Sequence, residues 1–191
     1  GPNSKLIWQA GSKDEAKKLA RSMGVSVIPG EDCISALTLL EKAGNNPIRY
    51  FRNQIKKFQF KLPKNWESLE KIDQANVLLK ASYLKKIDLF SISDLQIKST
   101  EIVKTLLENN PGKRIRFKHV LGGGGKGQRI VSSVEEVPDA VMSVLVESKT
   151  NGVGDNKNFL IELNIENSRH VASIAVCYIA DFNLHGERER E

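Results

Sequence analysis

The sequence predicts an α+β fold, in which a small antiparallel sheet with covering helices is joined to a helical segment. Two observations predict it. Apolar residues recur at helical spacing through residues 48–110, and from residue 114 onward short alternating or apolar stretches surround a run of glycines. With 191 residues, the chain is long enough for one or two domains with a real core. No apolar run approaches the roughly 18 residues that cross a bilayer.

The first region, residues 1–44, is expected to hold two helices and a short strand. Four apolar residues at helical spacing indicate the first helix, namely Ala16, Leu19, Ala20 and Met23. Gly24 ends this helix, and residues 25–28 then predict a strand that Pro29-Gly30 stops. A second helix is expected over residues 34–43.

The second region, residues 45–112, is expected to be a helical insertion. Its apolar sides comprise Ile72, Ala75, Leu78, Leu79 and Ala81 to Leu84, then Ile102, Val103, Leu106 and Leu107. Residues 45–118 hold 16 Lys and Arg against 7 Asp and Glu. The helical part has no histidine or cysteine, so we interpret it as a packing or interface module. Its basic surface faces water, an acidic partner or nucleic acid.

The third region, residues 113–191, has strand periodicity. Residues 114–119 alternate strictly, which places Ile115, Phe117 and His119 on one face of a strand and the basic residues on the other. A return strand is expected over residues 128–132, a helix over 134–148, and further strands over 159–165 and 171–180. The inward side of that helix is expected to comprise Val137, Val141, Val144 and Leu145.

Four consecutive glycines, residues 122–125, connect the first two of these strands. Glycine lets backbone N–H groups approach a ligand closely, and consecutive N–H groups converge on phosphate oxygens. A basic strand leads into this loop and Lys126 follows it, which favours a flap over nucleotide phosphates. The alternative is a hairpin tip without a ligand. Neither a Walker A loop nor a Rossmann fingerprint fits, because Gly-Lys precedes neither Ser nor Thr and a strand follows.

These residues resemble the biotin carboxylases of the ATP-grasp superfamily. Lys118-x-x-x-Gly-Gly-Gly-Gly-Lys-Gly127 is similar to the family's glycine-rich loop. Further similar stretches follow the family's order, namely Ala10-Gly-Ser-Lys13, Gly24 to Gly30, Glu162 with the turn Glu166 to His170, and Gly186-Glu-Arg-Glu189. The resemblance covers about residues 1–44 and 113–189. It implies an ATP-grasp-type lid subdomain in the third region, entered from the first.

The resemblance also implies residue roles. Lys13 and Lys118 would neutralise ATP phosphates, and the backbones of Gly124 and Gly125 would bind them. The remaining positions lie around the base, with Glu162 starting an inter-domain hinge, Leu163 and Ile165 pairing through their backbones with adenine, and His170 near the nucleotide. Each has an ordinary alternative: an exposed helix lysine for Lys13, a sheet-edge charge for Glu162, a turn histidine for His170.

In this family MgATP activates bicarbonate to carboxylate biotin on a carrier domain, for acyl-CoA or pyruvate carboxylation. The family's magnesium ligands lie downstream of residue 191, so we expect a fragment that is inactive alone and has no metal site or catalytic residue of its own. Expected partners are the rest of the biotin carboxylase domain, the carrier domain, the carboxyltransferase, and another subunit docked on the insertion. Neither nucleic acid nor a membrane is expected as a partner.

Departures from the family pattern keep other functions open. Ala172 and Ile174 stand where the family has glutamate and glutamine, which favours a non-catalytic scaffold or regulatory domain. Another ATP-grasp ligase is a further alternative, and a nucleic-acid binder is a distant one. Cys33 and Cys177 are far apart and lack ligand spacing, which predicts neither a disulfide framework nor a cysteine metal site. A reducing compartment follows, the cytoplasm or, in a eukaryote, the mitochondrial matrix.

Overall fold

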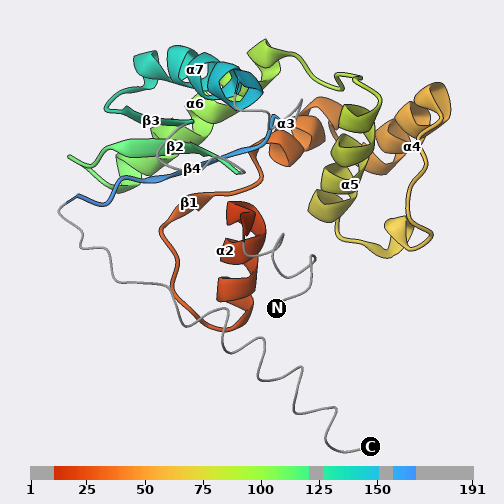
Figure 1. Ribbon diagram of the computed structural model, residues 1–191, viewed down its shortest axis with the longest axis horizontal. Coiled ribbons are helices and arrows are strands. Elements are labelled where there is room, and N and C mark those ends of the chain that lie inside the picture. Colours follow the sequence, from red (N-terminus) through yellow and green to blue (C-terminus); the bar gives the residue numbers. More distant parts are fainter. Residues whose placement is uncertain (1–10, 121–126, 151–156, 167–191) are drawn as a thin grey trace, which may run out of the picture.

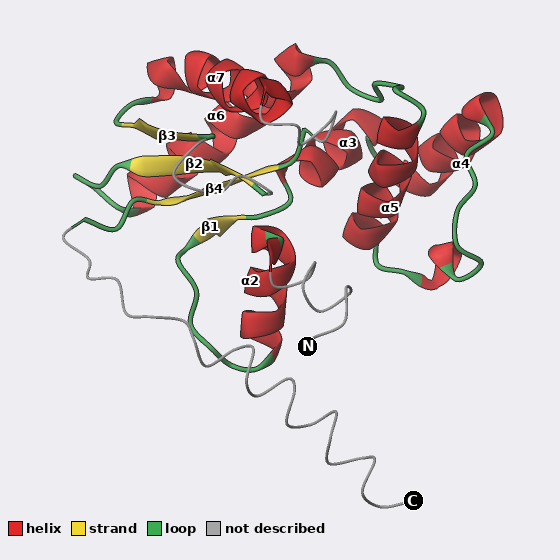
Figure 2. Ribbon diagram, viewed as in Figure 1, coloured by secondary structure: helices red, strands yellow, loops and turns green. Residues whose placement is uncertain are grey.

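A computed structural model describes residues 11–120, 127–150 and 157–166 of the chain. These residues form six α-helices and a four-stranded antiparallel sheet, which confirms the α+β class (Figures 1 and 2). The helices are α2 (Lys13–Ser22), α3 (Ile34–Ala43), α4 (Pro47–Phe58), α5 (Lys71–Leu84), α6 (Ile92–Asn109) and α7 (Val137–Thr150). The strands are β1 (Gly30–Glu31), β2 (Ile115–His119), β3 (Gln128–Val131) and β4 (Phe159–Leu163), in the order β1-β4-β2-β3.

The two faces of the sheet differ in chemistry. Ile115, Phe117 and His119 of β2 are buried, as the alternating sequence predicts. On β4, Ile161 lies opposite Phe117 on this apolar face. The other face is polar, because Arg116 lies opposite Glu162 and Lys118 follows two residues later. Helices α6 and α7 cover the apolar face, whereas α2 lies beyond the β1 side of the sheet (Figure 1).

Strand β1 corrects the prediction for the first region. Residues 25–28 form no strand, and the chain pairs with β4 two residues later, at Gly30 and Glu31. Gly30 has φ +151°, and a Cβ there would lie 2.1 Å from the carbonyl oxygen of Ile161. Glycine is therefore required where β1 meets β4, rather than serving as the strand stop that the sequence suggests.

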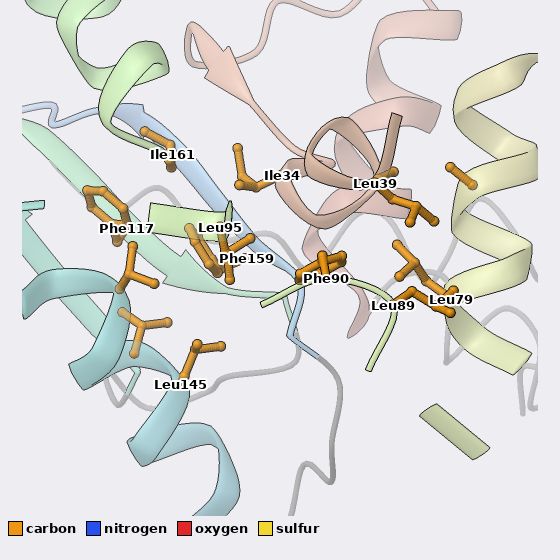
Figure 3. Packing of buried hydrophobic residues seen from close by; sticks show 14 of the residues in the cluster. Ile34, Leu39, Leu79, Leu89, Phe90, Leu95, Phe117, Leu145, Phe159 and Ile161 are labelled. Carbon is orange, nitrogen blue, oxygen red and sulfur yellow. The ribbon is translucent and has the colours of Figure 1, made fainter. Parts of the chain in front are cut away.

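One continuous hydrophobic core joins the sheet to the helical segment (Figure 3). Phe117 and Phe159 of the sheet lie with their ring centroids 5.7 Å apart, and Leu95 of α6 is buried near them. Helix α5 packs on α3, and Leu78 and Leu79 of α5 belong to the same core. Residues 45–112 thus contribute directly to the packing around the sheet.

Most helix predictions are confirmed. Helix α3 has the predicted bounds, and the four residues expected on the inner side of α7 are all buried, namely Val137, Val141, Val144 and Leu145. Leu84 is a correction, since its side chain is 88% exposed at the end of α5 instead of packing inward. No helix in the described part of the chain is long and apolar enough to cross a membrane. The strand predicted over residues 171–180 lies outside the described residues.

Candidate functional site

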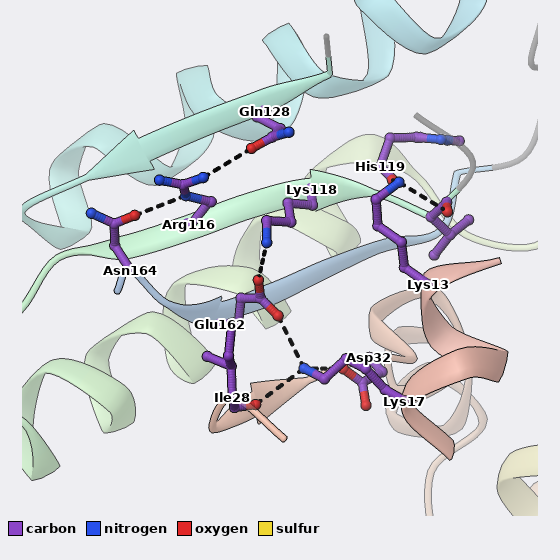
Figure 4. A network of polar contacts seen from close by, with 11 residues as sticks. Lys13, Lys17, Ile28, Asp32, Arg116, Lys118, His119, Gln128, Glu162 and Asn164 are labelled. Atoms are coloured by element: carbon purple, nitrogen blue, oxygen red, sulfur yellow. Dashed lines mark hydrogen bonds and ion pairs between the residues drawn. The ribbon is translucent and has the colours of Figure 1, made fainter. Parts of the chain in front are cut away.

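A chain of ion pairs on the polar face of the sheet joins β2, β4 and α2 (Figure 4). Glu162 of β4 lies at its centre. One carboxylate oxygen of Glu162 is 2.5 Å from the Lys118 ammonium, and the other is 3.0 Å from the Lys17 ammonium. Lys17 also lies 2.8 Å from Asp32 and donates to the carbonyl oxygen of Ile28 at 3.1 Å. These contacts tie the start of the chain to strands more than 100 residues later.

This ion cluster is largely shielded from water. The side chains of Glu162, Asp32 and Lys17 are 4%, 6% and 14% exposed, and that of Lys118 is 22% exposed. Removing charges from water costs several kcal/mol for each ion, so such groups persist only when they are well paired. Arg21, on the same side of α2 one turn after Lys17, adds a second cation against Asp32. The cluster therefore fixes α2 on the sheet by charge.

Lys13, at the start of α2, reaches the same end of the sheet. Its ammonium donates to the carbonyl oxygens of His119 and Val120 at 3.2 and 3.4 Å, and its backbone N–H also donates to Val120. Burial lowers the pKa of Lys13, and the nearby positive charge of Lys118 lowers it further. The carboxylates of Asp14 and Glu162 act in the opposite direction and offset part of this effect. Two ammonium groups from distant parts of the sequence thus lie near the same carboxylate, and an anion bound there would add further negative charge beside both.

Arg116 extends the polar face along β2. Its Nε donates to Asn164 at 2.8 Å and its guanidinium donates to Gln128 of β3 at 3.1 Å. Arg116 of β2 is therefore linked by its side chain to β3 and to Asn164, the residue that follows β4 (Figure 4). The strand alternation at residues 114–119 placed Arg116 beside Lys118, although its link to both neighbouring strands was not predicted.

The base of the glycine loop is anchored from two sides. The N–H of His119 donates to the carbonyl oxygen of Gly127 at 3.0 Å, which closes the hairpin between β2 and β3. The N–H of Gly127 donates to Glu147 of α7 at 2.5 Å, and Glu147 also pairs with Arg129. Gly127 has φ +68°, which favours glycine. The glycines assigned to phosphate binding, Gly124 and Gly125, lie outside the described residues.

The structure brings together three of the site residues that the sequence suggested, namely Lys13, Lys118 and Glu162. Leu163 ends β4, and its N–H donates to the carbonyl oxygen of Pro29 at 3.0 Å. Ile165 lies beyond the end of β4 and its side chain is 51% exposed. His170 lies outside the described residues.

Two residues of the cluster, Lys17 and Asp32, were missed from the sequence. A signal for Lys17 existed, because it lies four positions after Lys13 and so shares its helix face. Asp32 had no such signal, since it follows a strand that the sequence placed too early. Its role depends on the pairing of β1 with β4, which brings it beside Lys17.

No group of three or more His, Cys, Asp or Glu side chains is placed to hold a metal ion within residues 11–120, 127–150 and 157–166.

The chain was also compared with known proteins. No model of a protein family matches it, and no curated protein is similar enough to be counted as a relative.

Proposed function

We propose that this chain is the ATP-binding part of a biotin carboxylase-type ligase, which uses MgATP and bicarbonate to carboxylate biotin. The observation that carries the proposal is the position of the Lys13 ammonium on the carbonyl oxygens of His119 and Val120, directly after Lys118 and at the base of the glycine loop. Phosphates satisfy ammonium groups and backbone N–H groups together, and both are present or adjacent here. The resemblance in the glycine-rich loop and the entry segment supports the choice of family.

In this proposal each of the candidate site residues has a role in binding the nucleotide. Lys118 exchanges its contact with Glu162 for a phosphate oxygen, and Lys13 takes a second one. Lys17 stays as the counter-ion of Glu162, so the carboxylate remains paired after Lys118 turns away. The backbones of Leu163 and Ile165 would face adenine, with His170 nearby and Gly124 and Gly125 over the phosphates. The N–H of Leu163 already donates to Pro29, so adenine would use other backbone groups of this segment.

Bound ATP would supply the activating phosphate for bicarbonate, with Mg²⁺ as the usual counter-ion of its phosphates. The described residues include ammonium groups for phosphate but no cluster of acidic ligands for the metal, so we assign no residue to Mg²⁺. The biotin carrier domain, the carboxyltransferase and the rest of the carboxylase domain remain proposed partners.

Calorimetric titration with MgATP tests the proposal on the chain itself. We expect binding by the wild type and a loss of ten- to hundredfold in affinity in Lys13→Met and Lys118→Met, because each removes a charge-assisted hydrogen bond of roughly 1.5–3 kcal/mol. Lys104→Met removes an equal charge at an exposed site on α6 and should bind as the wild type does. Absence of binding by the wild type, or equal affinity in all three variants, would contradict the proposal.

Two alternatives remain, and an assay separates them from the main proposal. A scaffold or regulatory domain would show no biotin-dependent release of ADP when the chain is combined with the rest of its carboxylase domain. Another ATP-grasp ligase would bind MgATP with the same dependence on Lys13 and Lys118, yet biotin and bicarbonate would not stimulate ATP consumption. Stimulation by both compounds together is the expected result for a biotin carboxylase.

A further inference from the structure

The C-terminal ends of α4 and α5 meet at a surface rich in lysine, far along the chain from the ion cluster of the sheet. The ammonium of Lys85 donates to the carbonyl oxygens of Phe58 and Gln59 at 2.8 and 3.0 Å, which joins the two ends. We name this surface the basic corner, and its members are Leu84, Lys56, Lys57, Lys61, Lys85 and Lys86, all of them exposed. Figure 1 shows α4 and α5 side by side at one end of the molecule.

The positive charge of the basic corner is not neutralised by nearby carboxylates. Among the described residues, none of its five lysines forms an ion pair. The carboxylate of Glu67, which follows α4 in the chain, pairs with Arg52 of α4. The two helix C-termini offset part of the charge, because each carries about half a negative charge. Five ammonium groups against about one negative charge leave a surplus of about four.

An exposed leucine lies within this charge. Leu84 is 88% exposed, more than any other large apolar side chain in the described part of the chain. It directly precedes Lys85 and Lys86 at the end of α5. A leucine in such a position gains free energy only when a partner covers it, by roughly 1.5–3 kcal/mol for full burial.

The backbone of the basic corner is also unusual. Gln59 and Lys86 have φ angles of +51° and +56°, and they are the two non-glycine residues with positive φ in the part of the chain that the structure describes. Helix ends commonly use this conformation, but glycine is the residue that adopts it without cost.

We propose that the basic corner docks an acidic protein segment whose apolar side chain covers Leu84. The positive charge of the basic corner favours an acidic partner. The exposed leucine favours a protein over a nucleic acid, because a phosphodiester backbone has no apolar group that could cover Leu84. The aromatic rings beside the lysines are not presented for stacking on bases, since Phe60 is buried and Phe58 packs against the core. A single leucine is also too small an anchor for a membrane. The proposal does not depend on nucleotide binding by the sheet.

Fluorescence anisotropy with defined probes tests this docking surface. The probes are a labelled helical peptide of glutamate, alanine and a leucine stripe, a matched peptide with glutamine in place of leucine, a DNA duplex, and vesicles of phosphatidylglycerol. We expect the leucine peptide to bind about tenfold more tightly than the glutamine peptide, and Leu84→Ser to remove that difference. Lys56→Gln with Lys61→Gln should weaken binding of both peptides.

The matched control carries Lys104→Gln with Lys113→Gln, which removes the same charge from exposed positions on and after α6. This control should bind the leucine peptide as the wild type does, and circular dichroism should show all variants folded. Equal binding of the two peptides, an equal loss in the control, or preference for the duplex or the vesicles would overturn the proposal, as would absence of peptide binding.

Discussion

Glu162 is the central anion of the sheet's polar face, because its two carboxylate oxygens form separate ion pairs with Lys118 and Lys17. Glu162→Gln keeps the shape but leaves two partly buried ammonium groups without their shared carboxylate. We expect a loss of about 3 kcal/mol in the free energy of unfolding, since breaking a buried pair leaves an uncompensated charge. Chemical denaturation measures it, with the exposed Glu108→Gln as the control that should stay within about 0.5 kcal/mol of the wild type. If Glu162→Gln lowered the free energy of unfolding no more than the control does, the ion cluster would not stabilise the fold.

At the residue scale, the resemblance to the biotin carboxylases singled out Lys13, Lys118 and Glu162, and these three residues lie close together in the structure. The ATP-binding roles that the resemblance implies for them stay predictions. Lys17, Arg21 and Asp32, which complete the ion cluster, were not foreseen. Their importance arises from a strand pairing of only two residues, which no local pattern in the chain announces.

Helix α6 shows how a single element is fixed at its start. The Ser91 hydroxyl accepts from the N–H of Asp94 at 3.0 Å, and the Asp94 carboxylate accepts from the N–H of Ser91 at 2.7 Å, which forms a capping box. The hydrogen bond from Lys42 and that from Ser91 lower the pKa of Asp94 to about 2, from an ordinary 3.8.

Asp94→Ala should cost about 1 kcal/mol of stability at neutral pH, since it removes this cap. A carboxyl with a lowered pKa stabilises the fold above its ordinary pKa and loses that effect as pH falls through its folded pKa. The difference between wild type and variant should therefore be constant above about pH 5, decline as pH falls further, and vanish only below about pH 2. Thermal unfolding at several pH values measures it, with Glu108→Ala at the other end of α6 as a control. A difference that is independent of pH would contradict the role of the Asp94 charge.

At the element scale, helices with a long apolar periodicity were predicted correctly. Predictions failed where the structure of a segment depends on pairing or packing with a distant part of the chain. The bounds of α3 and the inward side of α7 follow from spacing alone. Residues 25–28 include three β-branched residues, which favour a strand, yet no strand in the described part of the chain pairs with them. The ammonium of Lys17 donates to the carbonyl oxygen of Ile28 instead. Leu84 likewise matched the apolar side of α5, but it is the last residue of that helix and its side chain is exposed.

The whole molecule shares one core, although its sequence reads as three regions of different character. Leu95 of α6 is fully buried, and the cluster around it includes residues of the sheet, of α3 and of α5. Sequence composition could not reveal this, because charge and periodicity mark local segments whereas packing joins distant ones.

Leu95→Ala should lower the free energy of unfolding by about 2–5 kcal/mol, the usual cost of truncating a buried leucine. The free energy of unfolding should fall by the same amount in the helical segment, residues 45–112, and in the sheet. Fluorescence of Trp66 in a Trp8→Phe background reports on the helical end, and amide hydrogen exchange of β2 reports on the sheet. Coincident transitions are expected from a shared core; separate ones would show that the helical segment unfolds by itself.

In the proposed function, the pairing of Lys118 with Glu162 also limits which anions could bind to the polar face. An incoming ion must displace a carboxylate that already lies 2.5 Å from the ammonium. Chloride or another monovalent ion exchanges one contact for an equal one and gains little. A polyvalent anion that spans Lys118 and Lys13 would take the place of the Glu162 carboxylate at Lys118, and at Lys13 it would offer a charged acceptor in place of the neutral carbonyl oxygens of His119 and Val120. The resting ion pair would therefore favour polyvalent over monovalent anions.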